Sequence, residues 1–368
     1  MKMKEKLLYL SFNSAKEPGV YKKINFQEKA ISKLKIIVYR SYIQNNIFYI
    51  NTMKVAKYNS SNKKIIKILR RLEIYFIFKK IKQFIYKEKI SVLYIRYYRT
   101  GILFYNFIKY VKKQYKLKII LEIPTYPYDN EVGAGNFGIL IDRVLRKKIY
   151  KYVDNIVTYS NDKVIWNIPC INISNGIDLK EVKIIEKKQH LGINFISVSN
   201  CSFWHEIDRF LYSLLQYKKN GGIEDLKFYI VGEGEETSKL KKIVDDNMEL
   251  QDIVIFHGFK SGEELDEIYN NSDIALGSLG IHRLKLESVQ PLKNREYCAK
   301  GLPFIIGFND PNFKNKEYVY EVSYDDELID IEKLIKWYRN LKISPEEIRK
   351  DAEEFTWDIQ MKKVLDNI

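Results

Sequence analysis

The sequence predicts an α/β protein made of two doubly wound parallel-sheet domains in series. At 368 residues the chain is too long for one ordinary core and fits two domains. Short runs of β-branched and aromatic residues alternate with longer stretches of helical periodicity, the pattern of a parallel sheet with crossover helices. A polar, lysine-rich linker at 179–191 separates the two sets. We expect domains at 1–180 and 181–352, with a C-terminal helix at about 353–368 that packs back on the first.

The expected elements follow in order along the chain. In the first half, strands are expected at Leu7–Phe12, Ile47–Ile50, Val92–Ile95, Lys118–Ile123, Asn155–Thr158 and Ile171–Ile173, and helices at 24–35, 65–88, 102–115 and 138–151. In the second half, strands are expected at Ile193–Ser199, Leu226–Val231, Ile253–Phe256, Asp273–Leu276 and Pro303–Gly307, and helices near 206–220, 237–247, 262–271 and 294–300. Gly221 and Gly301 stand where helix C-terminal caps belong.

The charge of the chain is divided unevenly. Residues 1–180 hold 36 Lys and Arg against 12 Asp and Glu, whereas the remainder is acidic, within a net charge of +15. A basic half of this size suits a phosphate-rich partner, either an anionic membrane or nucleic acid, although AT-rich codon usage alone would also enrich lysine. The segment Lys63–Lys89 interleaves basic and apolar residues, so it can lie on an anionic membrane or pack on the sheet. No nucleic-acid recognition motif is present.

Cysteine spacing and hydropathy bear on compartment and metals. Cys170, Cys201 and Cys298 lie far apart, without zinc or disulfide-scaffold spacing, which favours a reducing compartment. The run Leu7–Phe12 is shorter than a signal-peptide core, and no apolar run could span a bilayer. We therefore expect a cytoplasmic protein, soluble or peripheral on the inner face of the plasma membrane. No Asp-x-Asp pair follows a strand, so no metal site and no cofactor are expected.

Loops after strands are the place to look for ligands in such a sheet. In the first domain, Gly19 precedes an expected helix and could let the backbone approach a phosphate. The loop Leu121–Glu131 contains two prolines, two tyrosines and several acids, which suits substrate contact, and Asp129 is its candidate catalytic residue.

Four stretches of the sequence carry a family resemblance. They are Asn175-Gly-Ile-Asp178 near the linker, Val231-Gly-Glu-Gly234, Phe256-His-Gly258-Phe259, and Pro291-Leu-Lys293-Asn-Arg-Glu296-Tyr-Cys-Ala-Lys-Gly301-Leu-Pro303. In this order they resemble the motifs of family-4 glycosyltransferases of the GT-B fold, in particular the branch that builds bacterial surface polysaccharides. The resemblance implies two Rossmann-like domains that face each other across a cleft.

The resemblance also implies roles for individual residues. Lys293, just ahead of an expected helix, would offer a cation and a helix dipole to the diphosphate of a nucleotide sugar, and Glu296 would hold the ribose hydroxyls. Gly234, Gly258 and Phe259 would line the nucleotide, with the last two beside the base. An amphipathic surface helix with a solvated Lys and Glu is the alternative for the Lys293 segment.

The sequence departs from the family pattern in two places. The first glutamate of the family motif, eight residues before Glu296, is replaced by Ser288, with Glu287 beside it. The family's diphosphate-clamping Arg and Lys are replaced by Asn200–Arg209, which resembles a variant of the polysaccharide branch. There His205 or Arg209 would face the phosphates. His282 and Arg283 precede the lysine segment and could meet the diphosphate or the acceptor.

These features together predict a retaining, metal-independent glycosyltransferase. It would move a sugar from a UDP-, GDP- or TDP-linked donor onto a lipid-linked glycan acceptor in surface polysaccharide biosynthesis, and an anionic membrane surface is a further candidate partner. Retention of configuration is implied by the resemblance alone. Two alternatives stay open: a catalytically silent GT-B subunit that scaffolds a partner transferase, which the missing glutamate keeps in play, and a GT-B epimerase or hydrolase of sugar nucleotides.

Overall fold

The chain folds into two compact units. The computed structural model describes residues 5–14, 18–58, 64–97, 99–126, 137–286 and 289–367. Unit 1 comprises Met1–Ser174 together with Trp357–Ile368, and unit 2 comprises Asn175–Thr356. The change of unit falls at Ser174 rather than at residue 180, and the chain re-enters unit 1 at Trp357.

Unit 1 holds a nine-stranded sheet in the order β4-β3-β2-β1-β5-β6-β7-β9-β8. The strands are β1 Lys6–Leu10, β2 Ile37–Gln44, β3 Ile47–Ile50, β4 Met53–Lys57, β5 Val92–Arg96, β6 Lys118–Ile123, β7 Asn155–Thr158, β8 Val164–Ile165 and β9 Ile168–Asn172. The sheet is not purely parallel, because β2, β3 and β4 form an antiparallel meander. Asn45 and Asn46 make the first turn with φ of 49° and 60°, the left-handed conformation of a tight hairpin.

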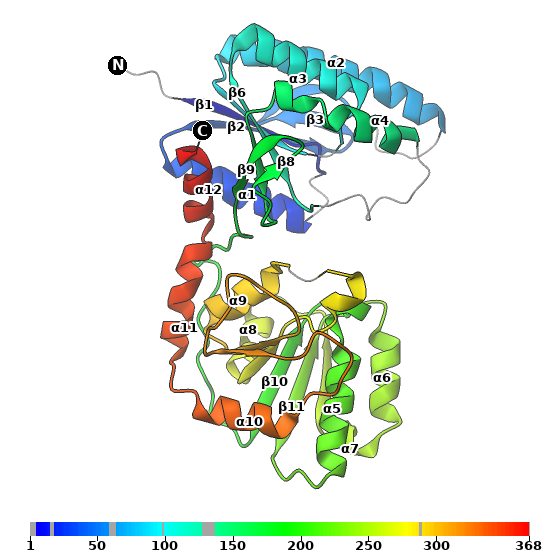
Figure 1. The fold of residues 1–368 in the computed structure, drawn as a ribbon, viewed down its shortest axis with the longest axis vertical. Coiled ribbons are helices and arrows are strands. Elements are labelled where there is room, and N and C mark those ends of the chain that lie inside the picture. The colour runs from blue at the N-terminus through cyan, green and yellow to red at the C-terminus, as the bar shows by residue number, and fades with distance from the viewer. Residues whose placement is uncertain are drawn as a thin grey trace. The chain divides into compact units, whose positions relative to one another are not determined.

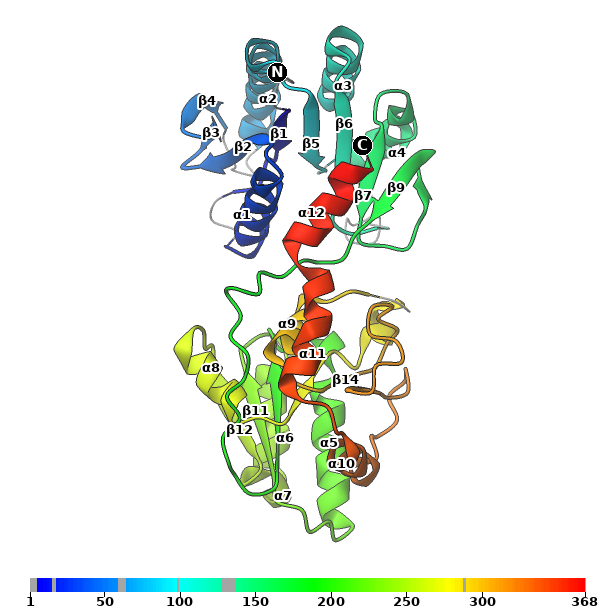
Figure 2. The same ribbon diagram turned by 90° about the vertical axis from the view of Figure 1, so that its left-hand side faces the viewer.

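Two helical layers cover this sheet (Figure 1 and Figure 2). The helices α2 Lys64–Glu88, α3 Ile102–Tyr115 and α4 Phe137–Arg146 lie on one face, and α1 Pro18–Lys33 and α12 Trp357–Asp366 on the other. In β1, Leu8 and Leu10 enter the core with α2 and α3, whereas Leu7 and Tyr9 enter the core with α1 and α12, as strand alternation requires. The helix expected from residue 24 begins at Pro18.

Unit 2 holds a six-stranded parallel sheet in the order β12-β11-β10-β13-β14-β15. Its strands are β10 Ile193–Val198, β11 Leu226–Val231, β12 Val254–Gly258, β13 Ile274–Leu276, β14 Phe304–Ile306 and β15 Val319–Glu321. Its helices are α5 Ile207–Lys219, α6 Thr237–Asp245, α7 Met248–Gln251, α8 Glu263–Asn270, α9 Leu292–Lys300, α10 Ile331–Asn340 and α11 Pro345–Asp351.

The strand order reverses between β10 and β13. In open α/β sheets, ligands bind beyond the carboxyl ends of the strands at such a switch point. The loops that follow β10 and β13 are therefore the part of unit 2 where a ligand is expected. Among the helices within the described ranges, none combines the length and the apolarity that a membrane crossing requires.

Candidate functional site

A lysine, a histidine and two polar side chains meet at the switch point of unit 2. Lys293, in the first turn of α9, places Nζ 3.1 Å from Nδ1 of His205, which follows β10. Ser278, which follows β13, lies 3.0 Å from the same ring nitrogen through Oγ. The opposite ring nitrogen, Nε2, lies 2.8 Å from Oδ1 of Asn200. Two strand-end loops and one helix N-terminus thus converge on a single imidazole.

These contacts define the protonation of His205. An amide oxygen only accepts, so Nε2–H donates to Asn200, and Nδ1 accepts from Ser278 and Lys293. Burial, and secondly the Lys293 charge, lower the pKa of His205 to about 3. The ring is therefore neutral near pH 7 and orients Lys293 without adding charge to the site.

Lys293 has no acidic partner among the residues that the structure describes. Burial lowers the pKa of its ammonium to about 7. Within the described ranges no carboxylate forms an ion pair with it, and its hydrogen bond goes to a neutral ring. The N-cap of α9, Pro291, supplies no side-chain hydrogen bond to the first-turn N–H groups. A half-buried ammonium beside uncapped helical N–H groups suits an anion with several oxygens.

Glycines stand at the ends of the two strands on one side of β10, Gly234 just after β11 and Gly258 at the end of β12. A Cβ on Gly234 would lie 1.6 Å from the carbonyl oxygen of Asn200, so the loop after β11 packs directly on the loop after β10. Gly258 ends β12 with φ of 64°, and its carbonyl accepts from the N–H of Gly232 at 2.7 Å. Phe259 follows and is 82% exposed. Gly234 is thus placed against the Lys293 group, whereas Gly258 and Phe259 lie one strand farther along.

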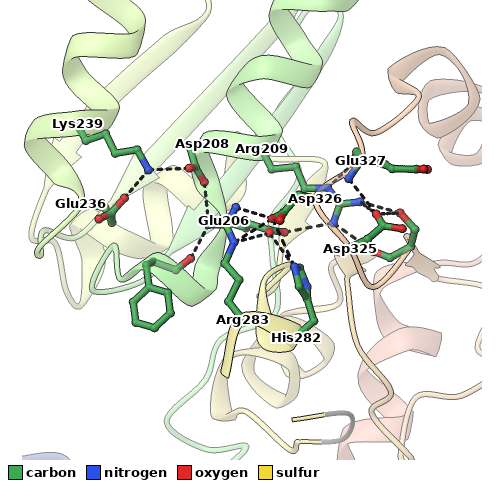
Figure 3. Close-up of polar contacts among 12 residues, drawn as sticks. Glu206, Asp208, Arg209, Glu236, Lys239, His282, Arg283, Asp325, Asp326 and Glu327 are labelled. Atoms are coloured by element: carbon green, nitrogen blue, oxygen red, sulfur yellow. Dashed lines mark hydrogen bonds and ion pairs between the residues drawn. The ribbon is translucent and has the colours of Figure 1, made fainter. Parts of the chain in front are cut away.

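Arg209, His282 and Arg283 belong to a second group, centred on Glu206 (Figure 3). Arg209 is buried and donates to the carbonyl of Glu327 at 2.5 Å, to Oγ of Ser323 at 2.8 Å and to Oε2 of Glu206 at 3.2 Å. Its charge is therefore engaged inside the unit, where it ties α5 to the loop before α10. The Arg209 guanidinium is therefore occupied by these partners rather than directed at a bound diphosphate.

The other two residues reach the same carboxylate from the segment after β13. Arg283 Nε lies 2.8 Å from Oε1 of Glu206, and Nε2 of His282 lies 3.4 Å from that oxygen and from Oδ1 of Asp326. Burial raises the pKa of Glu206 to about 7, against the lowering effect of the two arginines. Glu206, His282 and Asp326 could geometrically surround a metal ion, but the two guanidiniums on the same carboxylates disfavour a divalent cation.

The remaining predicted residues are placed as follows. Glu296 lies half-buried one turn after Lys293. The pKa of Tyr269 is raised well above its usual value, firstly by the burial of Tyr269 and secondly by the nearby charge of Glu296. Gly19 is in the first turn of α1 in unit 1. Asp129, Glu287 and Ser288 lie outside the described residues.

Comparison with known proteins bears on this domain. Residues 181–318 match the family model described as glycosyl transferases group 1. Over this stretch the chain is similar to group 1 glycosyl transferases. The stretch contains the Lys293 group, both glycine loops and, of the second group, Glu206, Arg209, His282 and Arg283.

Solved structures resemble the whole chain in fold. A glycosyltransferase from Rickettsia africae ESF-5 aligns at a TM-score of 0.65 with 14% identity, covering 99% of this chain and 98% of that one. The lipopolysaccharide outer core galactosyltransferase WaaB aligns at 0.61 with 12% identity, covering 99% and 100%. TarM aligns at 0.60 with 10% identity, covering 100% and 99%. The fold is thus that of GT-B glycosyltransferases. No curated protein matches the sequence.

Two members of the Lys293 group were missed from the sequence, Asn200 and Ser278. Each is a small polar residue just after a strand, which is an ordinary loop composition. Only the strand order brings β10 and β13 together and so places both side chains on His205.

The ionisation of Lys293 predicts a pH-dependent affinity of the glycosyl transferase domain for its donor. With a pKa of about 7, the free lysine is charged below pH 7 and loses its proton above it. An anionic donor binds the charged form of Lys293 more tightly than the neutral form. The Kd of the donor should therefore rise above pH 7, and well above the pKa the rise should approach about tenfold for each pH unit. Isothermal titration with a nucleotide sugar, whose diphosphate does not titrate here, would measure this between pH 6 and 8.5. A pH-independent Kd, or the same slope in Lys293→Met, would contradict it.

Glu296 should contribute to binding of the nucleoside rather than of the diphosphate. Glu296→Ala removes a charged hydrogen-bond acceptor worth roughly 1.5–3 kcal/mol, so nucleoside diphosphate affinity should fall about 10- to 150-fold. Inorganic pyrophosphate, which lacks the ribose, should bind the variant and the parent equally. Glu263→Ala, at the exposed start of α8, is the control for loss of one carboxylate. Equal nucleotide binding by Glu296→Ala and the parent would exclude the ribose role.

Proposed function

We propose that the chain is a retaining, metal-independent glycosyltransferase that moves a sugar from a nucleotide sugar to a lipid-linked glycan acceptor in surface polysaccharide biosynthesis. The observation that carries the proposal is the Lys293 ammonium at the N-terminus of α9, which has no ion pair with a described carboxylate and is held by a neutral His205, within a stretch similar to group 1 glycosyl transferases. Breaking the donor's glycosidic bond places negative charge on a diphosphate, and a fixed cation beside helical N–H groups stabilises that charge.

Metal independence is supported by the same geometry. The ammonium and the helix N-terminus supply the positive charge that a divalent ion would otherwise bring to the diphosphate. Retention follows the resemblance of the motifs to retaining enzymes. The surface-glycan pathway is supported by that resemblance and by the fold shared with WaaB, a lipopolysaccharide galactosyltransferase. We place the activity in the cytoplasm, peripheral on the inner membrane face.

Titration of the purified protein with UDP, GDP and TDP, with chelator present, tests the donor half of the proposal. One diphosphate should bind in the micromolar range, and the matching nucleotide sugars should then be hydrolysed slowly or transferred to a membrane extract. The anomeric configuration of the product follows from its NMR coupling constants. Absence of binding to all three diphosphates would overturn the proposal, and tight binding without turnover of any donor would indicate a silent subunit.

A further inference from the structure

Unit 1 contains a large cavity that no step of the proposed donor chemistry uses. Its volume is about 1010 Å³, at the upper end of small-molecule sites. One side of it is lined by Phe12 and Ser14, just after β1, by Ile95 and Arg96 at the end of β5, and by Arg99 and Gly101–Phe104 beyond that strand. Helix α2 and the turn between β2 and β3 line the other. The cavity thus lies at the carboxyl ends of parallel strands, where such sheets bind ligands.

The walls combine apolar surface with arginine. Aromatic and aliphatic side chains supply most of the lining, including Phe12, Tyr58, Phe78 and Phe104. The charged residues among the described lining are Arg70, Arg71, Arg96 and Arg99. Arg96 is paired with the buried carboxylate of Glu122 behind the wall, so Arg70, Arg71 and Arg99 are the candidates for contact with a ligand. A guanidinium group is the side chain best suited to phosphate oxygens. The cavity therefore suits a ligand with a long apolar part and a phosphate.

Two buried carboxylates fix the arginine-bearing segment. Glu122, fully buried, accepts from Arg96 at 2.5 Å and from the hydroxyls of Tyr9, Tyr94 and Tyr159 at 2.8 to 3.1 Å. Asp142, on α4, accepts from the N–H of Thr100 and the hydroxyl of Tyr97, both at 2.7 Å. Buried carboxylates thus fix the backbone and side chains on either side of Arg99. This wall of the cavity is therefore preorganised by hydrogen bonds to the interior of the unit.

The rim of the cavity is apolar and open to solvent. Leu72, Tyr75 and Ile102 line it although they are 53–58% exposed. Leu140 and Val144, on α4 of the same helical layer, are 58% and 56% exposed. On α2, Leu72 and Tyr75 lie between Arg70 and Arg71 on one side in sequence and Lys79, Lys80 and Lys82 on the other. Exposed apolar residues among basic ones are typical of a surface that meets anionic lipid.

We propose that this cavity binds the phosphate and the adjoining hydrocarbon of a lipid phosphate, with Arg70, Arg71 and Arg99 on the phosphate and the aromatic walls on the chain. The inference rests on the proposed function where it makes this lipid the carrier of the glycan acceptor. Binding itself does not depend on the donor site, because every residue that lines the cavity belongs to unit 1.

Farnesyl phosphate is the probe. Farnesol, which lacks the phosphate, and inorganic phosphate, which lacks the hydrocarbon, are the control ligands. The parent should bind farnesyl phosphate at least tenfold more tightly than either control ligand. Arg70→Gln/Arg71→Gln should weaken binding at least tenfold, whereas Lys79→Gln/Lys80→Gln, with the same charge change on the same helix outside the cavity lining, should not. Ile102→Asp should also weaken it, and Tyr110→Asp, exposed on α3 away from the lining, should not.

The outcomes separate this proposal from the donor assignment. Equal losses in the arginine and lysine pairs would mean non-specific charge attraction, and equal binding of phosphate or farnesol alone would mean that no combined site exists. Either result overturns the lipid-phosphate site. Nucleoside diphosphate affinity, measured in the same variants, should be unchanged. If it is absent in the parent while farnesyl phosphate still binds, the proposed function fails and the cavity assignment stands.

Discussion

Replacing Lys293 by methionine should lower sugar transfer by about 10²- to 10³-fold, the effect of removing one preorganised group that stabilises transition-state charge. Methionine keeps the apolar volume of the partly buried stem, so the fold should be preserved. The loss should appear mainly in kcat at saturating donor, because the charge on the diphosphate grows as the glycosidic bond breaks. Steady-state kinetics with the donor identified by titration would measure it, and circular dichroism would check the fold.

Lys241→Met, on the exposed face of α6, provides a variant with the same change in charge and composition. Its kcat should equal that of the parent. A Lys293→Met enzyme with parental kcat would show that the ammonium does not act on the leaving group. A raised KM with unchanged kcat would restrict Lys293 to ground-state binding.

Replacing Asp310 by alanine should lower the free energy of unfolding of unit 2 by about 3–5 kcal/mol, because it leaves a buried charge without its partner. Arg295, on α9, is fully buried and pairs with Asp310 through two contacts, 2.5 Å and 3.0 Å long. The guanidinium also lies 5.1 Å from the ring centre of Phe313. Denaturant titration followed by tryptophan fluorescence would measure the loss.

Two further variants make this test specific. Glu332→Ala breaks the exposed pair with Lys336 and should cost less than about 1 kcal/mol. The double variant Arg295→Met/Asp310→Ala should recover part of the lost stability, because it removes the stranded charge as well. If Asp310→Ala cost no more than Glu332→Ala, the pair would not anchor α9.

The sequence predicted regular elements better than it predicted their partners. Hydrophobic runs with clear turn signals placed β5, β6 and β7 within a residue or two, because burial on both faces demands continuous apolar runs. Strand β2 was missed because Arg40 and Ser41 interrupt its apolar residues, and the Asn45-Asn46 turn was not recognised as a hairpin signal.

The candidate site shows the same limit. Lys293 could be predicted because both its type and its place before α9 are visible in the sequence. The engagement of Arg209 with Glu206 and the 323–327 loop could not, because that loop is more than a hundred residues away and carries no motif. Which strand-end loops meet depends on strand order, and periodicity does not reveal strand order.

The placement of α12 in unit 1 has a consequence for the order in which the protein folds during synthesis. Trp357, Met361 and Val364 complete the apolar core beneath α1, and Lys33 pairs with Asp358 across 325 residues of sequence. A ribosome produces all of unit 2 before it produces α12. Unit 2 can therefore fold while the apolar surface of unit 1 that α12 covers is still exposed to solvent. The unit translated first is therefore the one completed last.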